Sequence, residues 1–205
     1  MAEIINFETV NIDKIVNRFQ QGQVIAFPTD TVYGMGVSLN SRDAIKRFYD
    51  LKLRPDDKPS QILISDNEML YKYVDQVSMQ TEILIERFWP GALTLIFNAT
   101  SEVPPRIIKD SAVGVRMPNY SLLQEVIAKL NCPVVTGSAN FAGEEAPTSF
   151  ESLNPELIKD LDVVISGPIL LNQESSVVDV RDGRIKILRE GVISLADIKQ
   201  TSVNI

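Results

Sequence analysis

The sequence predicts an α/β (α+β) fold built on a twisted, mixed β-sheet with flanking helices. Segments with apolar residues at helical spacing alternate with short apolar runs early in the chain, and strand-like runs lie close together later on. No internal repeat and no linker-like change of composition interrupts this order. We therefore expect one domain over about residues 5–200.

The first predicted elements are a helix, a strand and a second helix. The first helix ends at Gly22 and has an apolar face formed by Ile12, Ile15, Val16 and Phe19. Residues 24–27 are an apolar run stopped by Pro28, so they predict a buried strand, and residues 29–36 are expected to form a loop. Ser41 is a suitable N-cap for a second helix that ends near Leu51.

The later elements are predicted from the same patterns. Further helices are expected over about residues 66–73, 79–88 and 121–130. Strands are expected over about residues 62–64, 93–97, 113–117, 134–135, 163–165, 177–180 and 185–188. Because helices alternate with strands first and strands crowd later, the sheet should contain both parallel and antiparallel pairs.

The composition excludes several classes of protein. The chain of 205 residues contains no histidine, which excludes Ser-His-Asp and Cys-His catalysis and any His-ligated iron or zinc centre. Its formal charge of -7 disfavours a surface that binds nucleic acid throughout, although a local basic cleft stays compatible with it. The lone Cys132, the absence of signal-peptide features and the absence of a long apolar run predict a cytoplasmic protein.

Short polar clusters follow the apolar runs of the predicted sheet. They are residues 29–31, Arg116, residues 136–140, Thr148 with Ser149, and Ser175 with Ser176. In open α/β sheets, ligands bind in the crevice beyond the strand ends, where such loops meet. The clusters therefore predict a binding crevice lined by hydroxyl groups.

Four cations accompany these clusters and favour an anionic ligand. They are Lys52, Arg54, Arg116 and Arg189. Guanidinium groups bind phosphates and carboxylates through paired hydrogen bonds, and lysine supplies a point charge. Each residue also has a plainer interpretation: a lysine that interacts with a helix C-terminus, a turn or N-cap hydroxyl, or an arginine in a surface turn. The sequence contains no GxGxxG motif and no P-loop, so the residues alone predict only an anion-binding crevice.

Seven motifs occur in an order that one family shares: residues 28–34 (PTDTVYG), 52–55 (KLRP), 89–94 (WPGALT), 115–118 (VRMP), 138–140 (SAN), 175–179 (SSVVD) and 188–191 (LREG). Together they span nearly the whole chain and resemble the YrdC-like family, whose members include threonylcarbamoyl-AMP synthases. The resemblance implies a mixed sheet around a large basic cavity, in the bacterial single-domain form of that family.

The resemblance also implies a reaction. L-threonine, bicarbonate and ATP are joined into threonylcarbamoyl-AMP, and pyrophosphate is released by this nucleotidyltransferase chemistry. The product then passes to a tRNA threonylcarbamoyl transferase complex, which makes N6-threonylcarbamoyladenosine at position 37 of tRNA. The implied cofactor is Mg²⁺, which accompanies ATP as substrate, and no residue is assigned as its ligand.

The functional residues implied by the resemblance form three sets. The catalytic pair is Lys52 and Arg54, the family's Lys-x-Arg. The ATP contacts are Lys52, Arg54, Asn140, Thr148 and Arg189. The L-threonine contacts are Thr29, Arg116, Ser138 and Ser175. Lys52 is expected to face solvent, so that its replacement by alanine leaves the fold intact.

Three positions depart from the family pattern. The family often has Leu where this chain has Ser60 with Gln61, His where it has Asn119, and Thr where it has Ser176.

Two other functions stay open. One alternative is a non-enzymatic module that binds double-stranded RNA or acts as a translation factor. The other is a paralogue with a different substrate.

Overall fold

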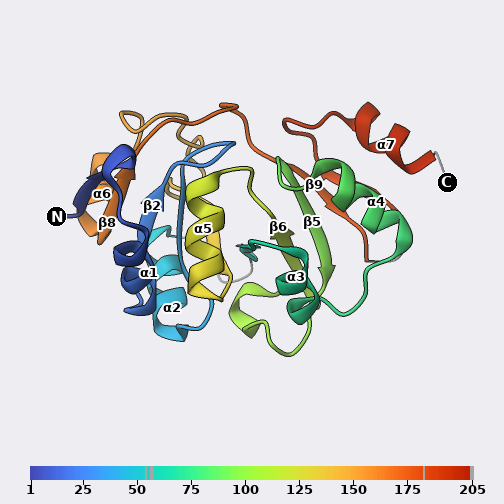
Figure 1. Ribbon diagram of the computed structural model, residues 1–205, viewed down its shortest axis with the longest axis horizontal. Helices are drawn as coiled ribbons and strands as arrows, with labels where there is room; N and C mark the ends of the chain where they lie inside the picture. Colours follow the sequence, from blue (N-terminus) through green and yellow to red (C-terminus); the bar gives the residue numbers. More distant parts are fainter. Residues whose placement is uncertain (54, 56–57, 182, 204–205) are drawn as a thin grey trace.

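A 10-stranded mixed β-sheet forms the centre of the computed structural model, which describes residues 1–53, 55, 58–181 and 183–203 (Figure 1). The strand order is β1-β8-β2-β3-β7-β4-β6-β5-β9-β10. The strands are β1 Glu3–Asn6, β2 Ile25–Phe27, β3 Gly34–Ser38, β4 Gln61–Leu63, β5 Leu93–Asn98, β6 Ala112–Arg116, β7 Val134–Ser138, β8 Val163–Ser166, β9 Ser176–Asp179 and β10 Lys186–Arg189. Parallel pairs (β1/β8, β2/β8, β4/β6 and β5/β9) lie among antiparallel ones, which confirms the predicted mixed sheet.

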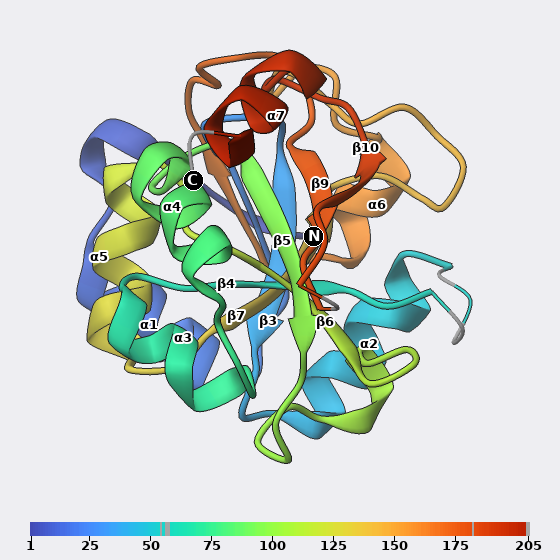
Figure 2. The same ribbon diagram turned by 90° about the vertical axis from the view of Figure 1, so that its right-hand side faces the viewer.

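Helices cover both faces of this sheet. They are α1 Ile12–Gln20, α2 Arg42–Leu51, α3 Asn67–Tyr73, α4 Met79–Phe88, α5 Ser121–Leu130, α6 Pro155–Asp160 and α7 Leu195–Val203, with short 3₁₀ turns at Phe7–Thr9 and Pro105–Ile107. Figure 2 shows α1, α3, α4 and α5 on one side of the strands and α2 and α6 on the other. None of the helices within the described ranges is long and apolar enough to cross a membrane.

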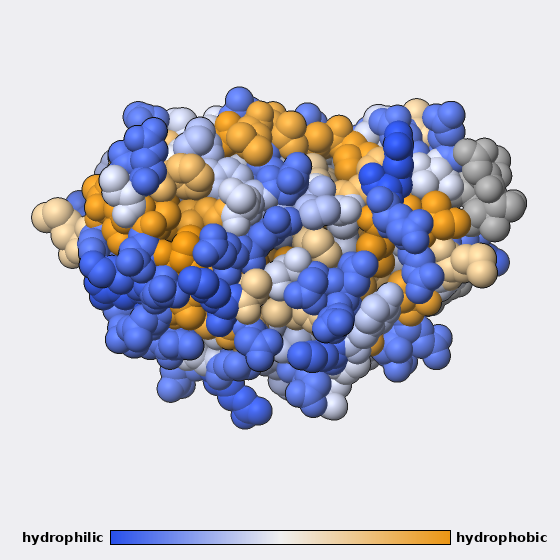
Figure 3. Space-filling model, in the orientation of Figure 1, coloured by the Kyte–Doolittle hydropathy of each residue, from blue (hydrophilic) through white to orange (hydrophobic). Residues whose placement is uncertain are grey.

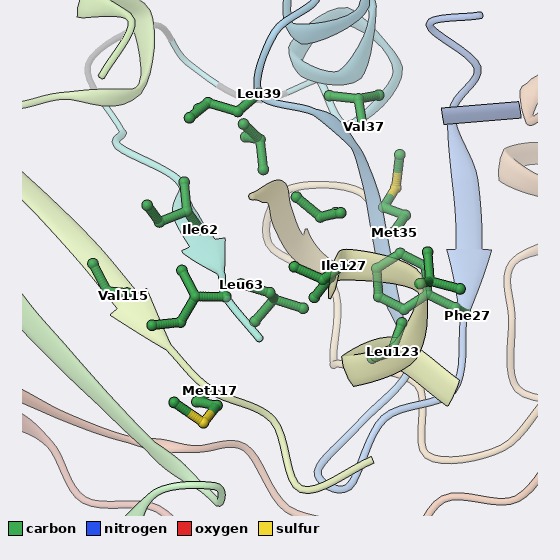
Figure 4. Packing of buried hydrophobic residues seen from close by; sticks show 14 of the residues in the cluster. Phe27, Met35, Val37, Leu39, Ile62, Leu63, Val115, Met117, Leu123 and Ile127 are labelled. Atoms are coloured by element: carbon green, nitrogen blue, oxygen red, sulfur yellow. The ribbon is translucent and has the colours of Figure 1, made fainter. Parts of the chain in front are cut away.

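The core lies between the sheet and the helices. Figure 4 shows Leu123 and Ile127 of α5 in the same apolar cluster as Phe27 and Met35 from β2 and β3, all of them buried. Polar side chains instead predominate at the surface in the view of Figure 3, where apolar side chains gather along the upper edge. The burial of apolar strands against amphipathic helices is the main source of stability in a fold of this kind.

The most periodic elements match the predictions, and strand β3 corrects one of them. Residues 29–36 were expected to be a loop, yet Gly34–Ser38 pairs with both β2 and β7. The two glycines of this strand lower its intrinsic strand propensity. They are required by packing, because a Cβ atom at Gly36 would lie 2.5 Å from the Val135 carbonyl oxygen.

Strand β1 and helices α6 and α7 have no counterpart among the predicted elements. Helix α6 spans only Pro155–Asp160, with Asn154 as N-cap and proline in its first turn. An Asn-Pro pair is a known start signal, but so short an apolar pattern does not distinguish a helix from a loop. Strand β1 has no fully buried residue, so its sequence lacks the alternation that identifies strands.

The N-cap of α3 provides a prediction about stability and pH. The Asp66 carboxylate accepts a hydrogen bond of 2.8 Å from the Met69 N–H, and this bond lowers the pKa of Asp66 below its ordinary value of 3.8. A lowered pKa means that the stabilising contribution is complete above the ordinary pKa and is lost as pH falls through the folded-state value. We expect Asp66→Ala to lower the free energy of unfolding by about 1 kcal/mol at pH 7.

Urea denaturation of the wild type and this variant at pH 7 and at about pH 3 measures the effect. The difference between the two proteins should shrink at the lower pH, and Asp66→Asn, which keeps an acceptor at the cap, should lose less stability. A difference that does not change with pH would contradict the assigned role of the carboxylate.

Candidate functional site

One face of the sheet carries a row of mostly small or polar residues that lie side by side and line a pocket. In register across the strands, Thr136 pairs with Gln61, Gln61 with Gly114, Gly114 with Ile96, and Ile96 with Asp179. Residues paired in register present their side chains on the same face of a sheet. Together they floor a pocket of about 450 Å³, which we call the sheet pocket.

A second pocket adjoins the sheet pocket, and a small cavity shares lining residues with both. The outer pocket, of about 560 Å³, shares Ser138, Glu174 and Arg189 with the sheet pocket. The inner cavity has about 30 Å³, which is room for about one water molecule. Its lining includes Thr29, Thr31, Gln61, Arg116, Thr136 and Ser138. Ser138, at the end of β7, therefore lines all three spaces.

The structure brings the implied ATP residues together. Lys52, Asn140, Thr148 and Arg189 all line the outer pocket, although they come from three separate segments of the chain. Arg54 lies outside the described residues. Within the described part of the chain, the implied nucleotide set therefore converges on one space, as the strand-end clusters predicted.

Lys52 corrects the expectation that this position faces solvent. It follows helix α2, which Ser41 caps as predicted, and its exposed fraction is only 2%. Its ammonium donates to the Ser138 carbonyl oxygen and, over 2.9 Å, to the Asn140 carbonyl oxygen. In return the Ala142 N–H donates to the Lys52 carbonyl oxygen over 2.9 Å. The Ser138 carbonyl oxygen also accepts from the Asn140 N–H over 3.0 Å, so the ammonium adds a charge-assisted donor to a turn that the backbone alone bonds only in part.

Asn140 and Ser138 form a compact turn around that ammonium group. The Ser138 hydroxyl donates to the Asn140 Oδ1 atom over 2.5 Å, and the Asn140 amide donates to the Glu144 carbonyl oxygen over 2.7 Å. Thr148 stands nearby, and its backbone N–H donates to the Ser152 hydroxyl over 3.1 Å. These bonds fix the turn 138–148 along the wall of the outer pocket.

Arg116 ends strand β6 and is buried in a network of oxygen acceptors. It forms an ion pair with Asp30, and the two side chains are 4% and 1% exposed. Its Nη1 atom donates to the Thr31 hydroxyl over 2.8 Å and its Nε atom donates to the Gly91 carbonyl oxygen over 2.9 Å. Burial lowers the pKa of the Arg116 guanidinium, and the Asp30 charge opposes that change. An arginine nevertheless stays charged at neutral pH.

The remaining implied threonine residues occupy different places. Thr29 lines the inner cavity, and its hydroxyl also closes a turn by donating to the Val32 carbonyl oxygen over 2.7 Å. The structural and the ligand-binding interpretations of Thr29 are therefore compatible. Ser175 is not part of the inner lining: its hydroxyl is bonded to the Thr94 hydroxyl over 2.9 Å.

Arg189 stands between the outer pocket and the sheet pocket. Its guanidinium donates to the Glu174 carboxylate over 2.6 Å and to the Ser175 carbonyl oxygen over 3.0 Å. Arg189 ends strand β10 and so does not lie in the surface turn that the sequence also allowed, although its side chain is 42% exposed.

The outer pocket is mixed in charge, which corrects the expectation of a basic cavity. Among the described lining residues, the cations Lys52, Lys58 and Arg189 face the acidic residues Glu144, Glu145, Glu174 and Glu190. Three of these carboxylates are engaged within the protein: Glu174 by Arg189, Glu144 by the Phe141 N–H over 3.0 Å and Glu190 by the Leu195 N–H over 2.8 Å. A triphosphate that enters the pocket therefore meets fixed cations beside carboxylates most of which already have partners.

Several residues in or beside the pockets were given no functional role from the sequence. Asp30 is paired with Arg116, Gln61 and Thr136 face two of the pockets, and Thr94 donates to the Gln61 Oε1 atom over 2.9 Å. The available signal was a polar residue at alternate positions of otherwise apolar strands. That signal identifies the face of a strand but does not reveal which strands are neighbours.

Comparisons with known proteins identify relatives that are similar over most of this chain. A threonylcarbamoyl-AMP synthase from Pyrococcus abyssi is 34% identical over 184 residues, which are 88% of this chain and 54% of the relative. A protein of the same name from Vibrio vulnificus is 30% identical over 185 residues, covering 88% of this chain and 98% of the relative. The chain thus spans about half the length of the Pyrococcus relative.

A solved structure and a family model extend the comparison to the fold. The crystal structure of P. abyssi Sua5 complexed with L-threonine matches with a TM-score of 0.91 at 30% identity, over 98% of this chain and 60% of that one. The family model Sua5/YciO/YrdC, described as "Telomere recombination", matches residues 17–191. The chain belongs to the Sua5/YciO/YrdC family.

Proposed function

We propose that this protein is a threonylcarbamoyl-AMP synthase that joins L-threonine, bicarbonate and ATP and releases pyrophosphate. One observation carries the proposal: the four implied nucleotide residues that the structure describes line one pocket, and three of the four implied threonine residues line a cavity that adjoins it. Relatives that bear this name, and a similar structure with L-threonine bound, support it. The mixed charge of the pocket does not favour the RNA-binding alternative.

In the proposed reaction the protein acts mainly by positioning and electrostatics. The threonine amine adds to bicarbonate and forms a carbamate with loss of water. A carbamate oxygen then attacks the α-phosphorus of ATP, and pyrophosphate leaves with the electrons of the broken P–O bond. Arg116 would bind the threonine carboxylate beside Thr29 and Ser138, and Arg189 would face the nucleotide phosphates. Lys52, together with Arg54, would stabilise charge that develops on the phosphates.

Mg²⁺ belongs to the proposal as a companion of ATP. Within the described ranges, no group of three or more His, Cys, Asp or Glu side chains is placed to hold a metal ion. A magnesium ion bound to nucleotide commonly takes most of its ligands from phosphate oxygens and water. The proposal includes the nucleotidyltransferase class, a cytoplasmic location, and transfer of the product to a tRNA threonylcarbamoyl transferase complex.

The test is direct detection of the product. The purified protein is incubated with ATP, Mg²⁺, L-threonine and isotopically labelled bicarbonate, and the mixture is analysed by mass spectrometry for a labelled adenylate and for pyrophosphate. We expect labelled adenylate only when threonine is present. A protein that binds ATP but forms the adenylate with another amino acid would support the altered-substrate alternative instead.

A further inference from the structure

The Arg116–Asp30 ion pair is the most deeply buried charge pair among those described in the structure. Arg116 lines the inner cavity, whereas Asp30 lies outside its lining. We propose that Asp30 is a positioning residue: it fixes the guanidinium of Arg116 so that the donors left over face a ligand whose anionic end lies at the inner cavity. The rest of that ligand extends into the sheet pocket, which shares Gln61, Thr136 and Ser138 with the inner cavity. The inference rests on the proposed function in one respect, since it takes that anionic end to be the carboxylate of L-threonine.

Counting the donors of Arg116 shows what Asp30 achieves. A guanidinium has five N–H donors. One donates to the Gly91 carbonyl oxygen, one to the Thr31 hydroxyl and one to the Asp30 carboxylate, at the Nε, Nη1 and Nη2 atoms respectively. Two N–H groups therefore remain, one on each terminal nitrogen. A pair of N–H groups matches the two oxygens of a carboxylate.

Asp30 is itself held in place from a second side. Its Oδ2 atom accepts a hydrogen bond of 3.2 Å from the backbone N–H of Asn119, while its Oδ1 atom accepts from Arg116. The carboxylate thus links the turn after β2 to the segment after β6, the strand that carries Arg116. Because both partners are fixed, rotation of the guanidinium would break a charge-assisted bond inside the protein.

Asp30 acts either through its charge or by orienting Arg116, and the net charge of the pair decides between these two roles. Together Arg116 and Asp30 are neutral, so Asp30 weakens rather than strengthens the attraction of Arg116 for an anion. Its benefit to binding must therefore come from orientation. Orientation affects the ligand that Arg116 touches and leaves a nucleotide bound in the outer pocket unaffected, which gives the proposal a distinct kinetic signature.

The test is a double-mutant cycle with Asp30→Asn and Arg116→Gln. We expect each single variant to raise the KM for L-threonine by at least about tenfold, the effect of one charge-assisted hydrogen bond, with the KM for ATP nearly unchanged. We expect the double variant to resemble Arg116→Gln, because Asp30 acts only through Arg116. The proposal would be overturned if the KM of the double variant for L-threonine rises by the product of the two single-variant increases.

A matched control and a charge-conserving variant separate orientation from loss of stability. Asp162 pairs with Arg47 away from the three pockets, and Asp162→Asn should leave both KM values unchanged. Asp30→Glu keeps the charge but moves the carboxylate, so it carries the test if Asp30→Asn does not fold. A folded Asp30→Glu variant with an unchanged threonine KM would contradict the proposal.

A measurement without ligand distinguishes this inference from the proposed function. In the free protein, the ¹⁵N-detected Nε–H signal of Arg116, assigned by its loss in Arg116→Gln, should exchange slowly with water in the wild type and quickly in Asp30→Asn. An unchanged signal overturns the positioning role even if the wild type makes the adenylate. A protein that neither binds L-threonine nor forms the adenylate, yet shows the expected change in this signal, overturns the proposed function while the positioning of Arg116 stands.

Discussion

Replacement of Lys52 by methionine is expected to remove most of the adenylate-forming activity and to destabilise the fold as well. Methionine preserves the apolar stem of the side chain but removes the ammonium that bonds the Ser138 and Asn140 carbonyl oxygens. A buried acceptor left without a donor costs about 1–3 kcal/mol of stability. Loss of a fixed charge-assisted donor in an active site lowers the rate about 10²–10³-fold.

The stability effect and the rate effect are measured separately. Urea denaturation gives the free energy of unfolding, and the labelled-bicarbonate assay gives the rate under conditions in which the variant is folded. Lys46→Met is a matched control on the helix that precedes Lys52, because the Lys46 side chain is 69% exposed and pairs with Asp50 at the surface. We expect this control to change stability by less than about 0.5 kcal/mol.

The two outcomes of the Lys52 variant have different meanings. A folded Lys52→Met protein with normal turnover would refute its catalytic role, whereas a loss of activity without loss of stability would show that the ammonium acts on substrate alone. We expect both losses together, because the same group holds the turn at Ser138 and lines the outer pocket. The same buried ammonium group is thus expected to serve both the structure and the reaction.

Much of the fold was predictable because its elements have clear hydrophobic periodicity. Helices α1, α2 and α5 and strands β4 and β5 follow the spacing of their apolar residues closely. Strand β3 was missed because its glycines are selected by the close approach of β7, a contact between segments that lie far apart in the sequence. Local propensity carries no information about such a neighbour.

The candidate site was predictable as a list of residues but not as a geometry. Polar clusters at strand ends identified Thr29, Arg116 and Ser138, which the sheet does bring together. The spacing of residues gave no reason to expect that Lys52 is buried or that Asp30 occupies one side of Arg116. Both follow from the need of buried polar groups for partners, which only the three-dimensional arrangement reveals.

Gly191 offers the second prediction with a large expected effect, because its backbone lies against residues that hold Arg189. A Cβ atom added at Gly191 would meet the Glu174 carbonyl oxygen and would lie 2.6 Å from the Ser175 carbonyl carbon. These are backbone atoms and cannot rotate away. We expect Gly191→Ala to separate the two segments and to lower the free energy of unfolding by about 3 kcal/mol.

The same separation should weaken nucleotide binding. The Ser175 carbonyl oxygen accepts two hydrogen bonds from Arg189, at 3.2 and 3.0 Å, so a shift of this carbonyl releases the guanidinium into the pocket in a wrong orientation. We expect the Kd for ATP, measured by calorimetry, to rise at least about tenfold, while the Kd for L-threonine changes less.

Gly183→Ala is a control for backbone strain, because Gly183 has a φ of 66° but no atom within 4 Å of the added Cβ. It should cost about 1 kcal/mol and leave ATP binding unchanged. If Gly191→Ala binds ATP as tightly as the wild type, then the hold of residues 174 and 175 on Arg189 does not matter for the nucleotide, and Arg189 has to be removed from the proposed ATP site.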